Sequence, residues 1–421
     1  MNASHRTKRI TIGWVLSFVA AFVAAASEDP VPKYFGASPG AMAEVKLHLK
    51  NGDKSFEPAL AALLHDADRA LLVAPPSVME KTRLPPSGDM HDYMSTAPYF
   101  WPDPARSNGL PYIRHDGKVN PESRSAASDH DRLGRMASTV QTLALAYYFT
   151  GKEPYAAQAA RLLRVWFLDP AARMKPNMDF AQGVPGVNTG RGTGVLEGRS
   201  IAEAADAAQL LAGSAAWTRQ DDAAFRDWLA QFLNWLLTSK HGRDEAAARN
   251  NHGTFYDVQV MRLALVLGKT DLAKQIASAA GAKRIAAQIE PDGRQPLELQ
   301  RTASLGYSSF NLQALFSLAT VAEYVGIDLW HYETPDHRST RKALDFLLPY
   351  VDVPARKWPY EQIKAYDPAG LAPVLRQAAN VFHEPRYERT LDNYADIGSK
   401  RFQLLCPPAN KGSTKREAGQ R

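Results

Sequence analysis

The chain has 421 residues, a formal net charge of +6 and one cysteine, Cys406. This length provides for one large domain or two ordinary ones, and one cysteine excludes an intrachain disulfide and a thiolate zinc cluster. This charge lies at the two ends of the chain, because residues 1–26 and residues 411–421 each contribute +3. The nearly neutral body has no basic stripe, so it is not expected to bind nucleic acid, and a few local arginines must hold any bound anion.

Residues 1–26 have the layout of a secretory signal peptide. Basic residues ending in Lys8 and Arg9 precede the uncharged apolar segment 10–26, whose last residues are small. The segment is at the short end of the roughly 20 residues that span a bilayer, which favours a cleaved signal over a membrane anchor. We expect cleavage after Ala26, export to the periplasm or the medium, and no membrane attachment afterwards.

The middle of the chain has the pattern of a helical protein. From Leu133 onward, apolar residues recur at helical spacing between short Gly, Pro, Asp or Asn connections, and strand-like alternation is nearly absent. Many helices of medium length with short connections indicate packed helical hairpins. The sequence shows no fixed-period repeat, which argues against a solenoid. We predict an all-α fold: an (α/α) toroid or incomplete barrel in one domain, residues 27–405, with a basic, disordered tail at 406–421.

Two long loops interrupt this pattern. Residues 83–125 are dense in proline and aromatic residues, and residues 170–200 contain several glycines. Loops of this length in a compact domain are usually functional or disordered, and the aromatic content argues against disorder. We therefore expect the loops to line a cleft.

A first cluster of polar side chains occurs at residues 249–257, at the entrance to an apolar helix. Asn251 and His252 can each donate a hydrogen bond to an anion. The same residues also suit an ordinary helix start, with Asn251 or Thr254 as the N-cap. Taken alone, the cluster fits both interpretations.

A second cluster, residues 298–312, combines a guanidinium and a phenol. Arg301 can hold a carboxylate by two parallel hydrogen bonds, and Tyr307 can exchange a proton if positive charge lowers its pKa from about 10. The alternative is structural: Arg301 would pair with Glu298 at the surface, and Tyr307 would be an aromatic wedge at a helix start.

The two clusters together suit one reaction, β-elimination from a 4-linked uronate. Neutral or cationic donors neutralise the C6 carboxylate and so make the C5 proton acidic. A base then removes this proton and an acid protonates the leaving O4, and one tyrosine can do both when they lie on the same face of the sugar. The common motifs for metals, nucleophiles and nucleotides are missing from the sequence, so we expect no metal and no cofactor.

Nine short segments in a fixed order carry a family resemblance. They are 89–95 (DMHDYMS), 98–104 (PYFWPDP), 110–114 (LPYIR), 120–122 (NPE), 166–170 (WFLDP), 181–182 (AQ), 250–254 (NNHGT), 301–307 (RTASLGY) and 358–360 (WPY). Over about residues 80–405 the chain resembles the alginate lyase superfamily, the helical-toroid lyases that include polysaccharide lyase families 5 and 38. One departure is Phe100 before Trp101, where two tryptophans are common.

The resemblance implies roles for the residues of both clusters. Asn251, His252 and Arg301 would neutralise the carboxylate, and Tyr307 would serve as base and acid. His252 would instead be the base in an anti elimination, depending on which epimer is cleaved. In the two loops the resemblance implies substrate contacts, although loop packing explains the aromatic residues almost as well. The implied contacts are Tyr99, Trp101, Tyr112, Arg114, Gln182 and Arg191.

The function that follows is a polysaccharide lyase. Its substrate would be a 4-linked uronic-acid polymer, either mannuronate-containing alginate or β-1,4-glucuronan, and its product would carry an unsaturated uronate end. One alternative is an α/α-toroid glycoside hydrolase with two carboxylates among Asp89, Asp92 and Glu298. The other is a non-catalytic, polysaccharide-binding periplasmic protein. The expected partner in each case is an anionic polysaccharide, and the oligomeric state is not predicted.

Overall fold

The computed structural model describes residues 1, 33–351 and 357–409. The predicted signal peptide, beyond its first residue, and the basic end of the chain from residue 410 lie outside the described residues. The described residues from 33 onward belong to one compact unit, Pro32–Arg421. Within the described part, no helix is both long enough and apolar enough to cross a membrane.

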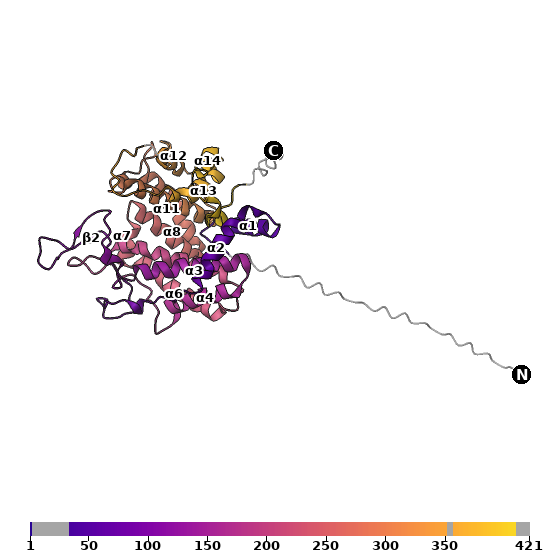
Figure 1. Cartoon of the computed structure of the whole chain (residues 1–421), viewed down its shortest axis with the longest axis horizontal. Helices are drawn as coiled ribbons and strands as arrows, with labels where there is room; N and C mark the ends of the chain where they lie inside the picture. Colours follow the sequence, from indigo (N-terminus) through magenta and orange to yellow (C-terminus); the bar gives the residue numbers. More distant parts are fainter. Residues whose placement is uncertain (2–32, 352–356, 410–421) are drawn as a thin grey trace. The chain divides into compact units, whose positions relative to one another are not determined.

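Helices dominate this unit, as predicted (Figure 1). The α-helices are α1 (Ala41–Lys50), α2 (Glu57–Ala70), α3 (His130–Thr150), α4 (Glu153–Leu163), α5 (Arg199–Ala208), α6 (Arg219–Thr238), α7 (Lys240–Ala246), α8 (Asn251–Val266), α9 (Thr270–Ala280), α10 (Pro296–Leu299), α11 (Ser304–Glu323), α12 (Thr340–Val351), α13 (Ala372–Phe382), α14 (Pro385–Leu391) and α15 (Phe402–Leu405). The strands are β1 (Met94–Thr96), β2 (Phe100–Trp101), β3 (Ile113–Arg114) and β4 (Phe180–Gly183). β1 pairs with β4 in parallel, and β2 pairs with β3 antiparallel.

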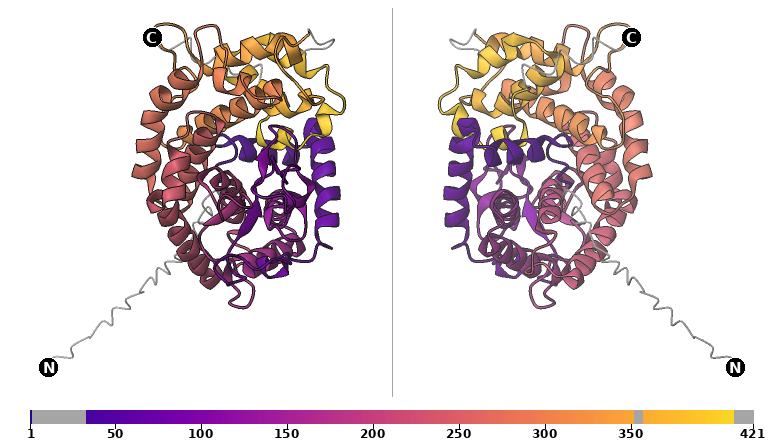
Figure 2. Two further views of the ribbon diagram at one scale, coloured as in Figure 1. Left: turned by 90° about the vertical axis from the view of Figure 1, so that its left-hand side faces the viewer. Right: turned by 90° about the vertical axis from the view of Figure 1, so that its right-hand side faces the viewer.

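The helices form two layers. The inner helices pack in sequence, α3 on α5, α5 on α8 and α8 on α11, while α4, α6, α9 and α12 contact them from outside. Figure 2 shows the helices of this unit following one another around a ring, and α15 contacts α1 and α2, which brings the two ends of the ring together. The predicted all-α toroid is confirmed.

The burial of each helix follows its sequence. The outer helix α6 buries one apolar face and begins with a capping box between Thr218 and Asp221. The inner helices α8 and α11 are buried on nearly all sides, and apolar residues are spread around their whole circumference. Asn251 and Asn311, two of the polar residues that they bury, have hydrogen-bond partners inside the protein.

All four inner helices begin at the same place. His130 starts α3, Arg199 starts α5, Asn251 starts α8, and Tyr307 lies near the start of α11. All four residues line one cavity. Because backbone N–H groups at a helix start are unpaired and carry partial positive charge, this arrangement favours an anion in the cavity.

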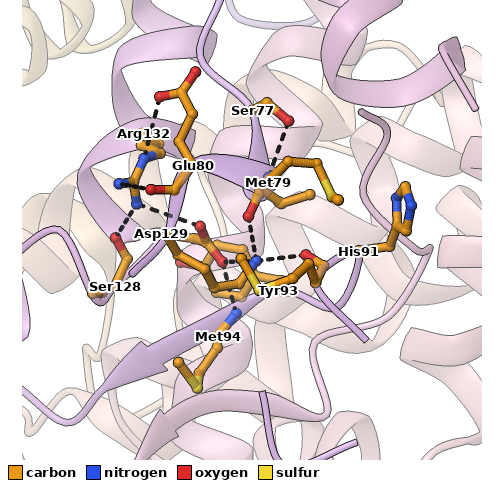
Figure 3. A network of polar contacts seen from close by, with 12 residues as sticks. Ser77, Met79, Glu80, His91, Tyr93, Met94, Ser128, Asp129 and Arg132 are labelled. Carbon is orange, nitrogen blue, oxygen red and sulfur yellow. Dashed lines mark hydrogen bonds and ion pairs between the residues drawn. The ribbon is translucent and has the colours of Figure 1, made fainter. Parts of the chain in front are cut away.

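A buried ion pair fixes the start of the long loop 83–125 beside α3 (Figure 3). Lys81 Nζ lies 3.1 Å from Asp129 Oδ2, and neither side chain is exposed. Lys81 also donates to the carbonyl of Met90 at 2.6 Å, and Asp129 accepts from the backbone N–H of Met94 at 3.0 Å. Burial raises the pKa of Asp129 to about 6 and lowers that of Lys81. The pair thus ties β1, and the loop that follows it, to the first turn of α3.

Candidate active site

A cavity of about 630 Å³ lies at the beginnings of the inner helices, with further walls from the two long loops. Eight of the ten site residues predicted from the sequence line it: Tyr99, Arg114, Gln182, Arg191, Asn251, His252, Arg301 and Tyr307. The other two are not among its lining residues. Trp101 donates to the carbonyl of Lys118 at 3.0 Å, and Tyr112 donates to Glu122 at 2.7 Å. Both of these aromatic residues brace the loop itself.

Asn251 is almost fully buried and is held by Glu298 from the short helix α10. Its Nδ2 donates to both carboxylate oxygens of Glu298, at 2.9 and 2.8 Å, and its backbone N–H donates to Oε1 at 2.8 Å. Burial raises the pKa of Glu298 above its usual value, and the hydrogen bonds from Asn251 oppose this rise. In this orientation the NH2 group of Asn251 is engaged by Glu298. The donor would face the substrate if the amide turned over and Glu298 carried a proton.

His252, the next residue, is oriented by Glu245. Its Nδ1 lies 2.7 Å from Glu245 Oε1, and this carboxylate is fully enclosed. A carboxylate at Nδ1 fixes the proton on that nitrogen, so Nε2 of the neutral ring carries the lone pair. The histidine is thus prepared either to accept a proton at Nε2 or, once protonated, to donate from it to an anion.

Arg301 and Tyr307 are stacked, and the long loop holds both. The guanidinium of Arg301 lies 3.7 Å from the centre of the Tyr307 ring and makes hydrogen bonds of 2.7 to 3.1 Å to Asp116. Arg301 therefore pairs with Asp116, whereas the structural alternative from the sequence expected Glu298. The Tyr307 hydroxyl donates to the Tyr99 hydroxyl at 2.6 Å.

These contacts set the protonation of the phenol. Burial raises the pKa of Tyr307 above 10, and its hydrogen bond to Tyr99 adds to this rise, while the positive charge of Arg301 opposes it. The phenol is therefore neutral at pH 7 and can donate a proton. To act as a base it must first lose that proton, which would require the environment to change when substrate binds.

The start of α8 is fixed from behind by a buried arginine. Arg284 donates to the carbonyls of Ala246 and Ala248, at 2.9 and 2.7 Å, and pairs with Asp257 at 2.7 Å. A side chain at Gly253 would overlap both the Ala248 carbonyl and the Arg284 guanidinium. Glycine is therefore required here, and the close approach that it permits positions the two residues before it.

The charges around the cavity are strongly unequal. Five arginines line it: Arg114, Arg124, Arg191, Arg199 and Arg301. The single acidic residue among its described lining is Glu197, which accepts hydrogen bonds from Tyr93, Ser95 and Gln182 at 2.6 to 3.1 Å. Gln182 in turn accepts from Arg191 at 2.9 Å. The nearly neutral body of the chain thus concentrates positive charge in one cavity, which suits a polyanion.

Among the described residues that line this cavity, there is no pair of carboxylates of the kind that a glycoside hydrolase needs. Asp89 lies 2.8 Å from Lys175, Asp92 is buried near the same lysine at 3.5 Å, and Glu298 binds Asn251. None of the three is among the cavity-lining residues. In the described part of the chain, no three His, Cys, Asp or Glu side chains are grouped so that they could hold a metal ion.

Sequence analysis missed several residues of the site. Arg124, His130, Glu197, Arg199 and Phe310 line the cavity, and Glu298 was considered only as a surface partner of Arg301 or as a hydrolase acid. A usable signal existed for Glu197 and Arg199, because both lie at the end of the second long loop, just where an apolar helical pattern resumes. The partners Glu245 and Asp116 had no local signal.

Comparison with known proteins supports this picture. The Alginate lyase family model matches residues 77–358. The structure of an alginate lyase from Bacteroides ovatus is similar at 41% sequence identity, with a TM-score of 0.85, over 89% of this chain and 99% of that one. No match was found among curated protein sequences.

More distant structures share the fold. Alginate lyase A1-III from Sphingomonas species A1 is 18% identical, with a TM-score of 0.53, over 90% of this chain and 99% of that one. A histidine-to-alanine variant of A1-III in complex with a tetrasaccharide is 17% identical, with a TM-score of 0.58, over 91% of this chain and 98% of that one. The family model and the closely similar Bacteroides structure together decide the assignment: this chain belongs to the alginate lyase family and is a polysaccharide lyase.

Proposed function

We propose that this enzyme cleaves alginate at mannuronate residues by β-elimination, with β-1,4-glucuronan as a second substrate. The observation that carries the proposal is the combination of Asn251, His252, Arg301 and Tyr307 in one cavity whose described lining has five arginines and one acid. The Bacteroides and Sphingomonas proteins with this fold are alginate lyases, and a variant of the latter holds a tetrasaccharide.

The two proposed polymers share the stereochemistry that matters. Mannuronate and glucuronate differ only at C2, and in both the C5 proton and O4 lie on the same face of the ring. A group on that face can therefore remove the proton and return one to the leaving oxygen. Guluronate is inverted at C5, so its C5 proton lies on the opposite face and needs a second group.

In the proposed mechanism Arg301 and His252 stabilise the charge that builds up on the substrate carboxylate as the C5 proton leaves. Asn251 joins them when its amide turns its NH2 group toward the cavity. Tyr307, once it has lost its own proton, removes the C5 proton on the face that this proton shares with O4. It then donates this proton to the leaving O4, which restores the phenolate. Arg301, stacked on the Tyr307 ring, stabilises this phenolate. On guluronate, the lone pair at His252 Nε2 is the candidate base.

Absorbance tests this proposal directly. The purified protein is incubated with polymannuronate, polyguluronate and glucuronan while the ultraviolet absorbance of the unsaturated uronate is followed. Absorbance should rise with polymannuronate and glucuronan and more slowly with polyguluronate. New reducing ends without absorbance would indicate a hydrolase, and binding without either product would indicate a non-catalytic protein.

A matched pair of variants assigns the chemistry to Tyr307. Tyr307→Phe should lower kcat by roughly 10²- to 10⁴-fold, the usual contribution of general acid–base catalysis. Tyr147→Phe removes a hydroxyl from α3 that bonds to Glu153 and does not line the cavity, so its activity should equal that of the wild type. Near-normal turnover by Tyr307→Phe would contradict the mechanism.

Export is part of the same proposal. The charged start, the apolar segment 10–26 and the small residues before Ser27 support cleavage of a signal peptide. The mature enzyme would then meet its polymer in the periplasm or outside the cell. N-terminal sequencing of the protein recovered from the periplasm and the medium tests this, with Ser27 as the expected first residue.

A further inference from the structure

The five arginines of the cavity differ in their partners. Arg114 and Arg301 share Asp116, each at 2.7 Å, and Arg191 donates to Gln182 at 2.9 Å. Arg124 lies 3.4 Å from Asp131. The guanidinium of Arg199, alone among the five, makes no hydrogen bond and no ion pair to any residue that the structure describes.

Aromatic rings hold Arg199 in place. Its guanidinium carbon lies 5.3 Å from the centre of the Phe255 ring and 5.2 Å from the centre of the Phe310 ring. The two rings are themselves 4.4 Å apart and tilted by 39°. Stacking on aromatic faces fixes the plane of a guanidinium without using any of its five N–H donors. These donors remain available to a ligand in the cavity.

The rings also show where Arg199 lies relative to the reacting groups. Phe255 follows Asn251 by four residues on α8, and Phe310 follows Tyr307 by three residues on α11, so each pair lies on one helix face. The two rings that hold Arg199 therefore lie about one helical turn, roughly 5.4 Å, beyond the reacting groups along their helices. This displacement is comparable to the length of one sugar ring.

We infer that Arg199 binds the carboxylate of the uronate next to the one that is cleaved. This inference rests on the proposed function, because a uronic-acid polymer presents one carboxylate on every sugar. The planar guanidinium of Arg199 donates two parallel hydrogen bonds to the second carboxylate, while Arg301, His252 and Asn251 act on the first. The cavity thus recognises two adjacent charges and disfavours a neutral sugar at the second position.

The alternative is that Arg199 only packs against the two phenylalanines, and substitution separates the two roles. Arg199→Met keeps a long apolar chain between the rings and removes all five N–H donors. Arg199→Lys keeps the positive charge and loses the planar arrangement that allows two parallel hydrogen bonds. Arg161→Met, an exposed position on α4 outside the cavity, is the matched control. Circular dichroism and thermal unfolding check that each variant is folded.

The first measurement is steady-state kinetics on polymannuronate. Arg199→Met should raise KM by roughly tenfold to a hundredfold, the range for hydrogen bonds to charged groups, with kcat changed less than about threefold. Arg199→Lys should lie between Arg199→Met and the wild type, and Arg161→Met should match the wild type. An unchanged KM in Arg199→Met, or in Arg199→Lys if the methionine variant does not fold, would overturn the inference.

The second measurement changes the substrate as well as the enzyme. Partially carboxyl-reduced polymannuronate carries neutral sugars among the uronates, so the wild type should bind it more weakly than the intact polymer. Arg199→Met should show a smaller difference in affinity between the two polymers, because it lacks the guanidinium that binds the second carboxylate. Equal discrimination by both proteins would contradict the inference.

Binding measured without turnover keeps the inference separate from the proposed function. Calorimetry of the intact polymer with Tyr307→Phe and with the double variant Tyr307→Phe/Arg199→Met gives the loss of affinity directly. If the wild type makes no unsaturated product from any uronate polymer, the proposed function fails. A loss of affinity in the double variant still supports the role of Arg199, and equal affinity refutes it.

Discussion

The hydroxyl of Tyr307 donates to the hydroxyl of Tyr99 across 2.6 Å, although 208 residues separate the two in the sequence. Tyr307 belongs to the inner helix α11, and Tyr99 belongs to the long loop that covers the cavity. The loop therefore contributes to the protonation of the central phenol, and this relationship leads to the first prediction.

Tyr99→Phe should shift the pH dependence of the reaction. The hydrogen bond to Tyr99 raises the pKa of Tyr307, so its removal lowers that pKa. As the proposed base, Tyr307 can remove the C5 proton only above its pKa. The acidic limb of the kcat/KM profile should therefore move to lower pH in the variant, with about a tenfold loss of activity at the optimum. An acidic limb that stays in place would mean that another group sets it.

We predict that protonated Glu298 holds the Asn251 amide with its NH2 group turned toward the substrate. Glu298→Gln replaces the acid with an amide whose NH2 can donate to Asn251 Oδ1, which leaves the Asn251 NH2 free for the substrate. This variant should keep its activity within about tenfold of the wild type, whereas Glu298→Ala should lose on the order of a hundredfold. Equal loss in the two variants would contradict this arrangement.

A proton count tests the same pair independently. If Glu298 takes up a proton when Asn251 turns toward the substrate, binding of polymer by Tyr307→Phe should take up a proton above the pKa of the free acid. Calorimetry in buffers of different ionisation enthalpy measures this uptake. The added substitution Glu298→Gln should abolish it, and an unchanged uptake would assign the proton to another group.

Glu245→Gln should weaken the enzyme by loosening His252. The carboxylate holds Nδ1 at 2.7 Å and thereby fixes the tautomer and the ring orientation. By analogy with partners behind metal-bound histidines, we expect a loss of roughly tenfold to a hundredfold in kcat, with little change in the thermal midpoint. The loss should be greater on polyguluronate, where His252 is the proposed base. Equal loss on all polymers would argue for a purely neutralising role.

The buried pair of Lys81 and Asp129 should contribute mainly to stability. Lys81→Met removes the nearest charged partner of the buried Asp129 carboxylate and leaves only Arg132 at 3.6 Å, so it should lower the free energy of unfolding by about 3–5 kcal/mol. The double variant Lys81→Met/Asp129→Leu removes both charges and should recover much of this loss. Urea unfolding of the three proteins measures the difference. A double variant no more stable than Lys81→Met would show that the carboxylate is not the cause.

The sequence alone determined the helical fold class and named most of the candidate residues of the site. Apolar periodicity identifies helices because each buried face must repeat every three to four residues, as the face of α6 does. Asn251 and His252 are adjacent, and Arg301 and Tyr307 are six residues apart, so each pair has a local signature. The family resemblance then joined the two pairs, and the structure places all four in one cavity.

Only the tertiary structure decided the partners of these residues. Asp116 reaches Arg301 across 185 positions, Tyr99 reaches Tyr307 across 208, and Glu298 reaches Asn251 across 47. Arg199 likewise became a candidate only when α5, α8 and α11 brought it between Phe255 and Phe310. No local period encodes such contacts, because they depend on how the inner helices pack and where the loops between them cross the cavity. The sequence therefore names the candidate reacting groups, and the folded chain sets their hydrogen-bond partners and orientation.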